Sequence, residues 1–149
     1  MKGKFGIDIR EFMQEYFDAW TEGVTEKILS YYSEDVAINL LGGPALLEGK
    51  GAVSENFVLP FTKAFPGNVH NILNLVHDGN QVVIEWMFTA IHSGDYGGIS
   101  PTGRTVNLPG CSVYTVEDEK ITRGNLYFNG PTLMEQLGAT SLIASVNEY

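Results

Sequence analysis

The sequence predicts an α+β fold in which N-terminal helices pack on a mostly antiparallel sheet. Three observations support it. Apolar residues recur at three- and four-residue steps near the N-terminus. Three runs rich in Val, Ile, Tyr, Phe and Thr follow between residues 81 and 129, separated by two turns. The helical patterns precede these runs instead of alternating with them, as is typical of α+β proteins. We expect the sheet to curl over an apolar pocket.

Composition restricts the class of protein. The chain has 149 residues, which favours one domain (1–149), and it carries 18 acidic residues against nine Lys and Arg. A formal net charge of −9 argues against nucleic acid and anionic membranes as partners, because both require clustered positive charge. The single cysteine excludes an internal disulfide framework. With no signal-peptide pattern and no run of about 20 apolar residues, the expected location is cytoplasmic.

The first helical region is expected at about residues 8–32. Its stripe of apolar residues lies on one face, Asp8 and Glu11 have the spacing of a capping box, and Gly23 can end the helix. A second, shorter helix fits residues 25–32. The stripe of the first helix consists of Ile9, Phe12, Met13, Tyr16, Phe17 and Trp20.

Another helix is expected at about 51–65, where Pro60 should kink or split it because proline lacks a backbone donor. Residues 36–41 read as a short strand. The main sheet is expected over residues 69–129, beginning with a hairpin that turns at Asp78 and Gly79. Residues 139–149 form a moderately apolar tail.

Pairing the hairpins about their turns sets Ile72 opposite Trp86, Trp86 opposite Gly110 and Ser112 opposite Leu126. Because strand side chains alternate, this pairing divides them between two faces. Pro109 could seat a bulge, which would invert the alternation on one side of it. The inner face is then expected to hold His70, Ile72, Asn74, Ile84, Trp86, Phe88, Ala90, His92, Val106, Leu108, Gly110, Ser112, Tyr114, Gly124, Leu126 and Phe128. The outer face would hold Leu73, Leu75, Met87, Ile91, Val113, Arg123 and Tyr127, which is apolar enough for a homodimer contact.

Several short motifs together resemble the SnoaL-like polyketide cyclase family, a branch of the nuclear transport factor 2-like superfamily. The resemblance covers nearly the whole chain, and it implies a cone-shaped, curled mixed sheet around a deep apolar pocket, often in a homodimer. The motifs are Trp86, His92-x-Gly94, Gly98-x-x-Pro101-Thr102-Gly103-Arg104, Val116-Glu117-Asp118-x-Lys120-Ile121, Tyr127-Phe128 and Gln136-Leu137-Gly138.

The functional residues that the resemblance implies are not all present. The cyclases' acid/base aspartate falls on Leu126, an assisting histidine on Ser112, and a first-strand asparagine on Ile38. Asn129 stands where many relatives carry aspartate, and the base of the ketosteroid isomerase branch would fall near Leu40. Leucine cannot transfer a proton, so neither mechanism carries over unchanged. The Asp-Arg-Asp set of the limonene epoxide hydrolase branch has no counterpart here.

His92 is the candidate for acid/base chemistry, because it ends a strand on the expected inner face beside a glycine-rich loop and histidine titrates near neutral pH. It could instead hydrogen-bond the loop backbone and fix its shape. His70 and Asn74 could orient a carbonyl or hydroxyl group of a ligand, or be satisfied polar groups in the core. No spacing of ligand residues favours a metal, and no cofactor is expected.

Two functional hypotheses therefore stand. The first is a cofactor-independent cyclase or isomerase acting on a small hydrophobic carbonyl compound, with His92 as the catalytic residue. The second is a non-catalytic binding protein for a small hydrophobic ligand. In both, the expected binding residues are Tyr16, Trp20, Ile38, His70, Asn74, Trp86, Phe88, Ser112, Leu126 and Asn129.

Overall fold

The computed structural model describes residues 8–41 and 46–139. Its centre is a six-stranded sheet in the order β2-β1-β6-β5-β4-β3. Strand β1 runs parallel to β6 and every other neighbouring pair is antiparallel, so the predicted mixed, mostly antiparallel sheet is confirmed. The strands are β1 (Tyr32–Leu40), β2 (Leu46–Glu48), β3 (Val69–Asp78), β4 (Gln81–Ile91), β5 (Thr105–Glu117) and β6 (Lys120–Phe128).

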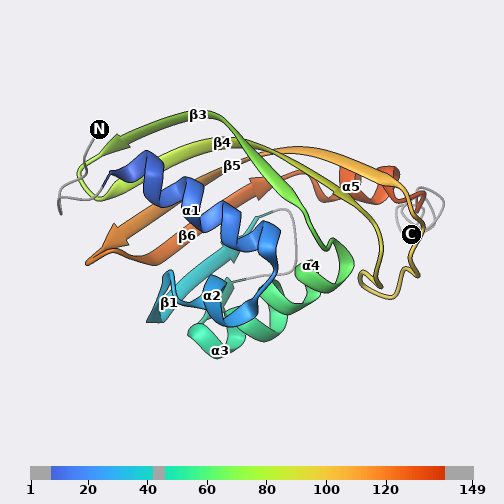
Figure 1. Ribbon diagram of the computed structural model, residues 1–149, viewed down its shortest axis with the longest axis horizontal. Coiled ribbons are helices and arrows are strands. Elements are labelled where there is room, and N and C mark those ends of the chain that lie inside the picture. The colour runs from blue at the N-terminus through green and yellow to red at the C-terminus, as the bar shows by residue number, and fades with distance from the viewer. Residues whose placement is uncertain (1–7, 42–45, 140–149) are drawn as a thin grey trace, which may run out of the picture.

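Helix α1 (Ile9–Glu22) lies across the sheet and packs on β3 (Figure 1). It begins as predicted: a side-chain oxygen of Asp8 accepts a hydrogen bond from the Glu11 backbone N–H at 3.1 Å. It ends at Gly23, whose φ of 79° is left-handed and suits glycine. The expected apolar stripe is buried from Ile9 to Trp20, which fixes the helix on the sheet.

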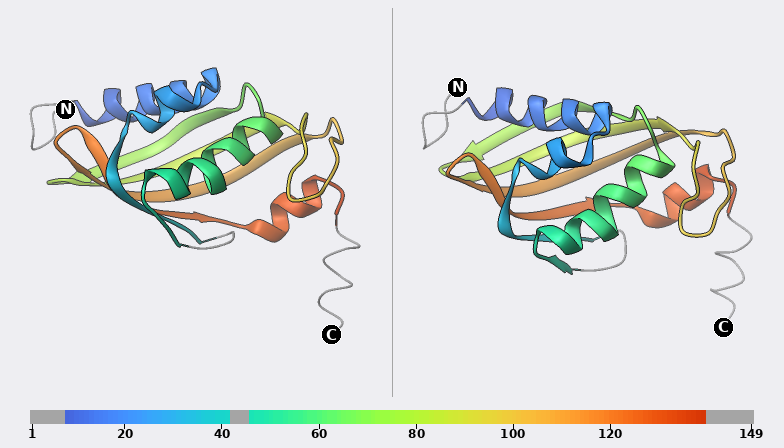
Figure 2. Two further views of the ribbon diagram at one scale, coloured as in Figure 1. Left: turned by 90° about the horizontal axis from the view of Figure 1, so that it is seen from below. Right: turned by 60° about the horizontal axis from the view of Figure 1, so that its bottom comes forward.

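The second helical layer is split at Pro60, as the sequence predicts. It comprises α3 (Lys50–Val53), a π-helical turn η1 (Ser54–Val58) and α4 (Leu59–Ala64). Proline has no N–H to donate to the carbonyl four residues earlier, and we attribute the wider π turn before it to this missing bond. The three segments lie along the curled sheet beside α1 and the short α2 (Thr25–Leu29), as both views of Figure 2 show.

The predicted strand register is confirmed at all three pairs, Ile72 with Trp86, Trp86 with Gly110, and Ser112 with Leu126. The alternation of faces is wrong in the second half of β3. A bulge between Ile72 and Asn74 inverts it, so that Leu75 is buried and Asn74 is exposed. No shift of register occurs at Pro109, which pairs with Met87.

The described residues after β6 include the short helix α5 (Gly130–Gln136), capped by Asn129, whose side chain accepts from the Thr132 N–H at 3.0 Å. The Gln136 side chain bonds both the N–H and the C=O of Asn107, which ties α5 to β5. Apart from Ala139, the predicted tail lies outside the described residues. No described helix is long and apolar enough to cross a membrane.

Candidate functional site

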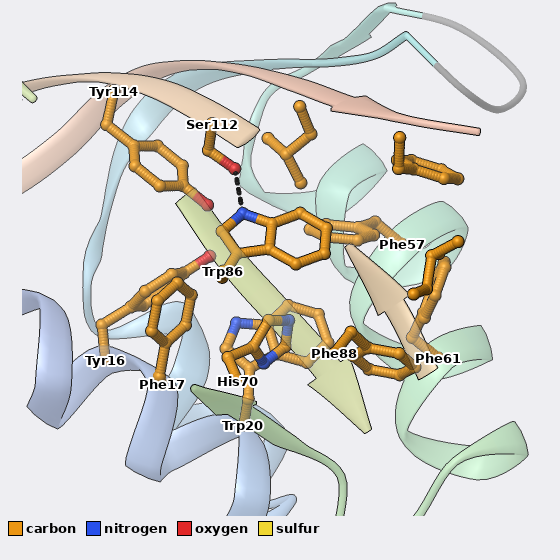
Figure 3. A pocket seen from close by; sticks show the side chains of 13 residues that line it. Tyr16, Phe17, Trp20, Phe57, Phe61, His70, Trp86, Phe88, Ser112 and Tyr114 are labelled. Atoms are coloured by element: carbon orange, nitrogen blue, oxygen red, sulfur yellow. Dashed lines mark hydrogen bonds between the residues drawn. The ribbon is translucent and has the colours of Figure 1, made fainter. Parts of the chain in front are cut away.

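An aromatic cavity lies between the inner face of the sheet, α1 and the η1–α4 segment (Figure 3). The space that the centre of a water molecule can reach inside it is about 40 Å³. That is room for a few waters, so a substituted benzene requires some lining side chains to move. The lining residues are Tyr16, Phe17, Trp20, Phe57, Phe61, His70, Trp86, Phe88, Leu108, Ser112, Tyr114, Leu126 and Phe128.

Trp86 lies at the centre of the cavity and is held in two ways. Its indole Nε1–H donates to Ser112 Oγ at 2.9 Å, drawn as the dashed line in Figure 3. Its ring also covers Gly110, where an added Cβ would lie 2.2 Å from the ring. Since a side chain at position 110 would displace the ring, this glycine is required by close approach.

Buried hydroxyl groups form a polar end of the cavity. The hydroxyls of Tyr16 and Tyr32 are 2.5 Å apart and hydrogen-bonded, and the ring of Tyr16 packs edge-on against that of Tyr114. In Figure 3 the Tyr16 and Tyr114 hydroxyls point toward one another. The pKa of both Tyr16 and Tyr114 is raised well above the usual value. Burial is the larger cause, and the neighbouring phenol is the second. The phenols therefore stay protonated and able to donate hydrogen bonds.

His70 is the one histidine among the described residues that line the cavity. Its ring stacks on Phe17 with centroids 4.5 Å apart and planes 8° from parallel, and it meets Trp86 and Phe88 edge-on. Burial lowers the pKa of His70 to about 3, because a charged imidazolium would lose its hydration among these rings. Its Nδ1 is buried without a hydrogen-bond partner in the part of the chain that is described. A polar atom of a ligand in the cavity could bond to this nitrogen.

The structure brings most of the predicted binding residues together. Seven of them line the cavity: Tyr16, Trp20, His70, Trp86, Phe88, Ser112 and Leu126. Ile38 is fully buried in β1 opposite Gly124 but does not line the cavity, and Asn129 caps α5. Asn74 was expected on the inner face, which is wrong because of the bulge in β3; it is exposed and its amide bonds Glu85.

His92 lies inside the protein but outside this cavity. Its Nδ1 accepts the Thr102 backbone N–H at 3.1 Å and is 2.9 Å from the Thr102 hydroxyl. Because Nδ1 accepts the Thr102 N–H, the proton of the neutral imidazole lies on Nε2. This nitrogen is buried and has no hydrogen-bond partner in the described chain. The ring of Phe65 lies beside it, at 5.7 Å between centroids. The geometry matches the alternative considered for His92, a side chain that holds the loop backbone.

Six lining residues were not among the predicted binding residues: Phe17, Phe57, Phe61, Leu108, Tyr114 and Phe128. Leu108, Tyr114 and Phe128 belong to the predicted inner face, so the strand alternation already indicated them. Phe57 and Phe61 belong to a helical apolar stripe, and such a stripe does not distinguish a cavity wall from packed core.

The cavity carries no formal charge. None of the described residues that line it is Asp, Glu, Lys or Arg, and Leu126 occupies the position that the resemblance assigns to a catalytic aspartate. Within residues 8–41 and 46–139, no three His, Cys, Asp or Glu side chains gather as a metal would require. The site can therefore orient a neutral ligand by hydrogen bonds and aromatic contacts, and the His70 imidazole is the one basic side chain in its described lining.

Comparison with known proteins gives a consistent family. A family model described as the SnoaL-like domain matches residues 13–124. No curated protein matches the chain. A candidate SnoaL-like polyketide cyclase from Jannaschia sp. CCS1 is 17% identical, with a TM-score of 0.75 over 87% of this chain and 91% of that one.

Two further solved structures agree. A candidate polyketide cyclase from Xanthomonas campestris pv. campestris is 26% identical, with a TM-score of 0.69 over 86% of this chain and 95% of the other. A protein of ketosteroid isomerase-like fold from Catenulispora acidiphila, solved with trimethylamine, is 18% identical, with a TM-score of 0.72 over 86% and 92% of the two chains.

Proposed function

This chain belongs to the SnoaL-like domain family, and from that premise we propose that it is a cofactor-independent cyclase or isomerase acting on a small hydrophobic carbonyl compound. The observation that supports this proposal best is the composition of the cavity. Aromatic rings form most of its wall, and its polar groups are limited to His70, Ser112, the Trp86 indole N–H and the tyrosine hydroxyls. Such a site excludes water and fixes the orientation of a ligand through few polar contacts.

The polar end suits a carbonyl oxygen. A hydroxyl has one proton and can accept two hydrogen bonds, so when Tyr32 donates to Tyr16, the Tyr16 proton can be donated to a ligand oxygen in place of the neighbouring Tyr114 hydroxyl. Donors fixed in a dry cavity stabilise an oxygen on which negative charge develops. A ketone oxygen placed there would therefore become enolate-like at low cost.

Neutral His70 is the proposed proton acceptor. It would take a proton from the carbon next to the carbonyl, and the electron pair of that C–H bond would move to the carbonyl oxygen as an enolate. In an isomerase His70 returns the proton to another carbon and the C=O bond re-forms. In a cyclase the enolate carbon attacks a second carbonyl carbon, the first C=O bond re-forms, and the oxygen of the attacked carbonyl takes the proton back from His70. The low pKa of His70 makes it a weak base, but the enolate charge formed beside it would offset part of that penalty.

The alternative function is binding without catalysis. It is favoured by one specific observation, the absence of any carboxylate from the described lining of the cavity, where Leu126 stands at the position that the resemblance assigns to an aspartate. A binding protein needs the aromatic wall and the hydrogen-bond donors but no base.

Deuterium exchange separates the two functions. Acetophenone is incubated with the protein in D₂O, and loss of its methyl proton signal is followed by NMR. A titration of the protein with acetophenone gives the dissociation constant. His70→Phe retains an aromatic ring beside Phe17 and removes the base. His92→Asn retains an acceptor for the Thr102 N–H and removes the imidazole.

An enzyme accelerates the exchange, and His70→Phe reduces the acceleration at least 10-fold while acetophenone still binds. His92→Asn leaves it unchanged. If His92→Asn abolishes exchange instead, His92 is the catalytic residue and the assignment to His70 fails. Binding without any acceleration supports the non-catalytic function.

We also propose that the chain forms a homodimer through the outer face of the sheet and works in the cytoplasm. Large apolar side chains remain exposed on that face, with Leu73 at 60%, Ile91 at 54% and Tyr127 at 48% exposure. Burial of such a patch would stabilise a dimer. Light scattering on wild type and on Ile91→Lys tests this: wild type should have twice the chain mass and the variant the mass of one chain.

A further inference from the structure

We propose that Phe61 determines the largest ligand that the cavity accepts, and that the ligand is neutral and elongated, with its oxygen at the tyrosine end. The inference rests on the proposed function, because it concerns the same cavity. It follows from a difference between the two ends: one is fixed by polar contacts and close packing, and the other is closed by side chains without polar atoms, most of them aromatic.

The tyrosine end has little freedom to adjust. The Tyr16 hydroxyl is bonded to Tyr32, and Trp86 is held by Ser112 and by the close approach of its ring to Gly110. Moving any of these side chains would break a buried hydrogen bond, which is costly in an apolar environment. A ligand too large for the cavity must therefore gain its space elsewhere.

The opposite end is formed by η1 and α4. There Phe57 is 7% exposed and packs on Trp20 at 4.9 Å between centroids, whereas Phe61 is only partly buried. The ring of Phe61 packs against four others, at 5.5 to 6.2 Å between ring centroids. They belong to Phe57, Phe65, Phe88 and Tyr96. Figure 3 shows Phe57 and Phe61 on the side of Trp86 away from Tyr16 and Tyr114.

The backbone beside Phe61 also favours adjustment. Phe61 directly follows Pro60, which lacks the N–H that would hold the preceding π turn in α-helical register. π turns inside helices are frequent at functional sites. Because the Phe61 side chain has no polar atom, it can move without breaking a hydrogen bond.

The charge of the ligand follows from the same lining. The described lining contains no Lys or Arg, and His70 stays neutral because burial lowers its pKa to about 3. An anionic ligand would lose its hydration without gaining a counter-charge. Carboxylates are therefore excluded in favour of neutral ketones.

The test compares acetophenone with the longer 2-acetylnaphthalene, by calorimetric titration of wild type, Phe61→Ala and Phe65→Leu. Phe65 is the control because it is buried on the same helix end and touches Phe61 but does not line the cavity. In Phe61→Ala the affinity for the naphthyl ketone should rise relative to that for acetophenone by roughly 10-fold or more, since the added ring finds apolar space. In Phe65→Leu the ratio should stay within about twofold of wild type.

The ratio separates a size limit from a loss of stability, because general destabilisation weakens both ketones alike. An unchanged ratio in Phe61→Ala, with acetophenone bound normally by wild type, overturns the role of Phe61 and leaves the proposed function standing. If wild type binds neither ketone, the proposed function fails and this inference fails with it. Binding of 2-naphthoate as tightly as 2-acetylnaphthalene would overturn the requirement for a neutral ligand.

Discussion

His70 should make the folded chain sensitive to mild acid, and replacing it with Phe should remove that part of the sensitivity. The imidazole is surrounded by Phe17, Trp86 and Phe88, and its pKa is lowered from 6.5 to about 3 by burial. The unfolded chain therefore binds a proton below pH 6.5 that the folded chain does not bind until about pH 3. Stability from this group is lost as the pH falls through that window.

The size of the effect follows from the two pKa values. At pH 7 an ordinary histidine is mostly neutral in both states, so the contribution is close to zero. At pH 5 the unfolded side chain is almost fully protonated, and each pH unit below 6.5 costs about 1.4 kcal/mol. Between pH 7 and pH 5, titration of His70 should therefore reduce the free energy of unfolding by about 2 kcal/mol.

Urea unfolding at pH 7 and pH 5 measures this contribution as a double difference. All other ionisable groups are common to both proteins, so their effects cancel between wild type and His70→Phe. We expect the wild type to lose about 2 kcal/mol more than the variant. His70→Gln, which is polar but does not titrate in this range, should behave like His70→Phe. Equal losses in wild type and both variants would show that His70 is protonated without penalty in the folded chain, which would refute the dry environment assigned to it.

Other substitutions test the framework of the cavity. Gly110→Ala places a Cβ against Trp86 and should lower the free energy of unfolding by about 1 to 3 kcal/mol. Calorimetry should show this as a fall in Tm of roughly 2 to 4 °C per kcal/mol. The control is Gly51→Ala, whose Cβ would have nothing within 4 Å and which should leave Tm unchanged or raise it slightly. Ser112→Ala leaves the Trp86 indole N–H without an acceptor and should cost about 1 to 3 kcal/mol in urea unfolding, with a shifted tryptophan emission; unaltered emission would contradict that bond. Asn129→Ala removes the cap of α5 and should cost about 1 kcal/mol, which normal stability of the variant would refute.

Much of the sheet could be predicted because turn residues set the register of hairpins. Fixing the turns placed Trp86 opposite Gly110, and the alternation then placed both on the inner face. The bulge near Leu73 could not be anticipated, since no glycine or proline marks it, and it reversed the positions of Asn74 and Leu75. A single extra residue is enough to invert every later side chain of a strand.

The site was predicted less completely for a different reason. Periodicity identifies which face a residue occupies but not where along the element the cavity begins and ends. His92 follows the inner alternation, yet it lies past the end of β4, against Phe65 and Thr102. The apolar stripe that contains Phe61 predicts packed core. Only the π turn and the rings around Phe61 indicate that it forms part of the cavity wall.

The parallel pairing of β1 with β6 has a consequence for how the protein is made. Residues near the two ends of the described chain, such as Ile38 and Gly124, lie side by side in the sheet, and the cavity takes side chains from Tyr16 through to Phe128. Contacts between such distant residues carry a high loop-closure entropy, and they tend to slow folding. On the ribosome, therefore, the N-terminal helices would emerge long before β6, and the inner face that they cover would be complete only after β6 had followed. A ligand of the cavity would act only after β6 has joined the sheet, and its binding would then stabilise the completed fold.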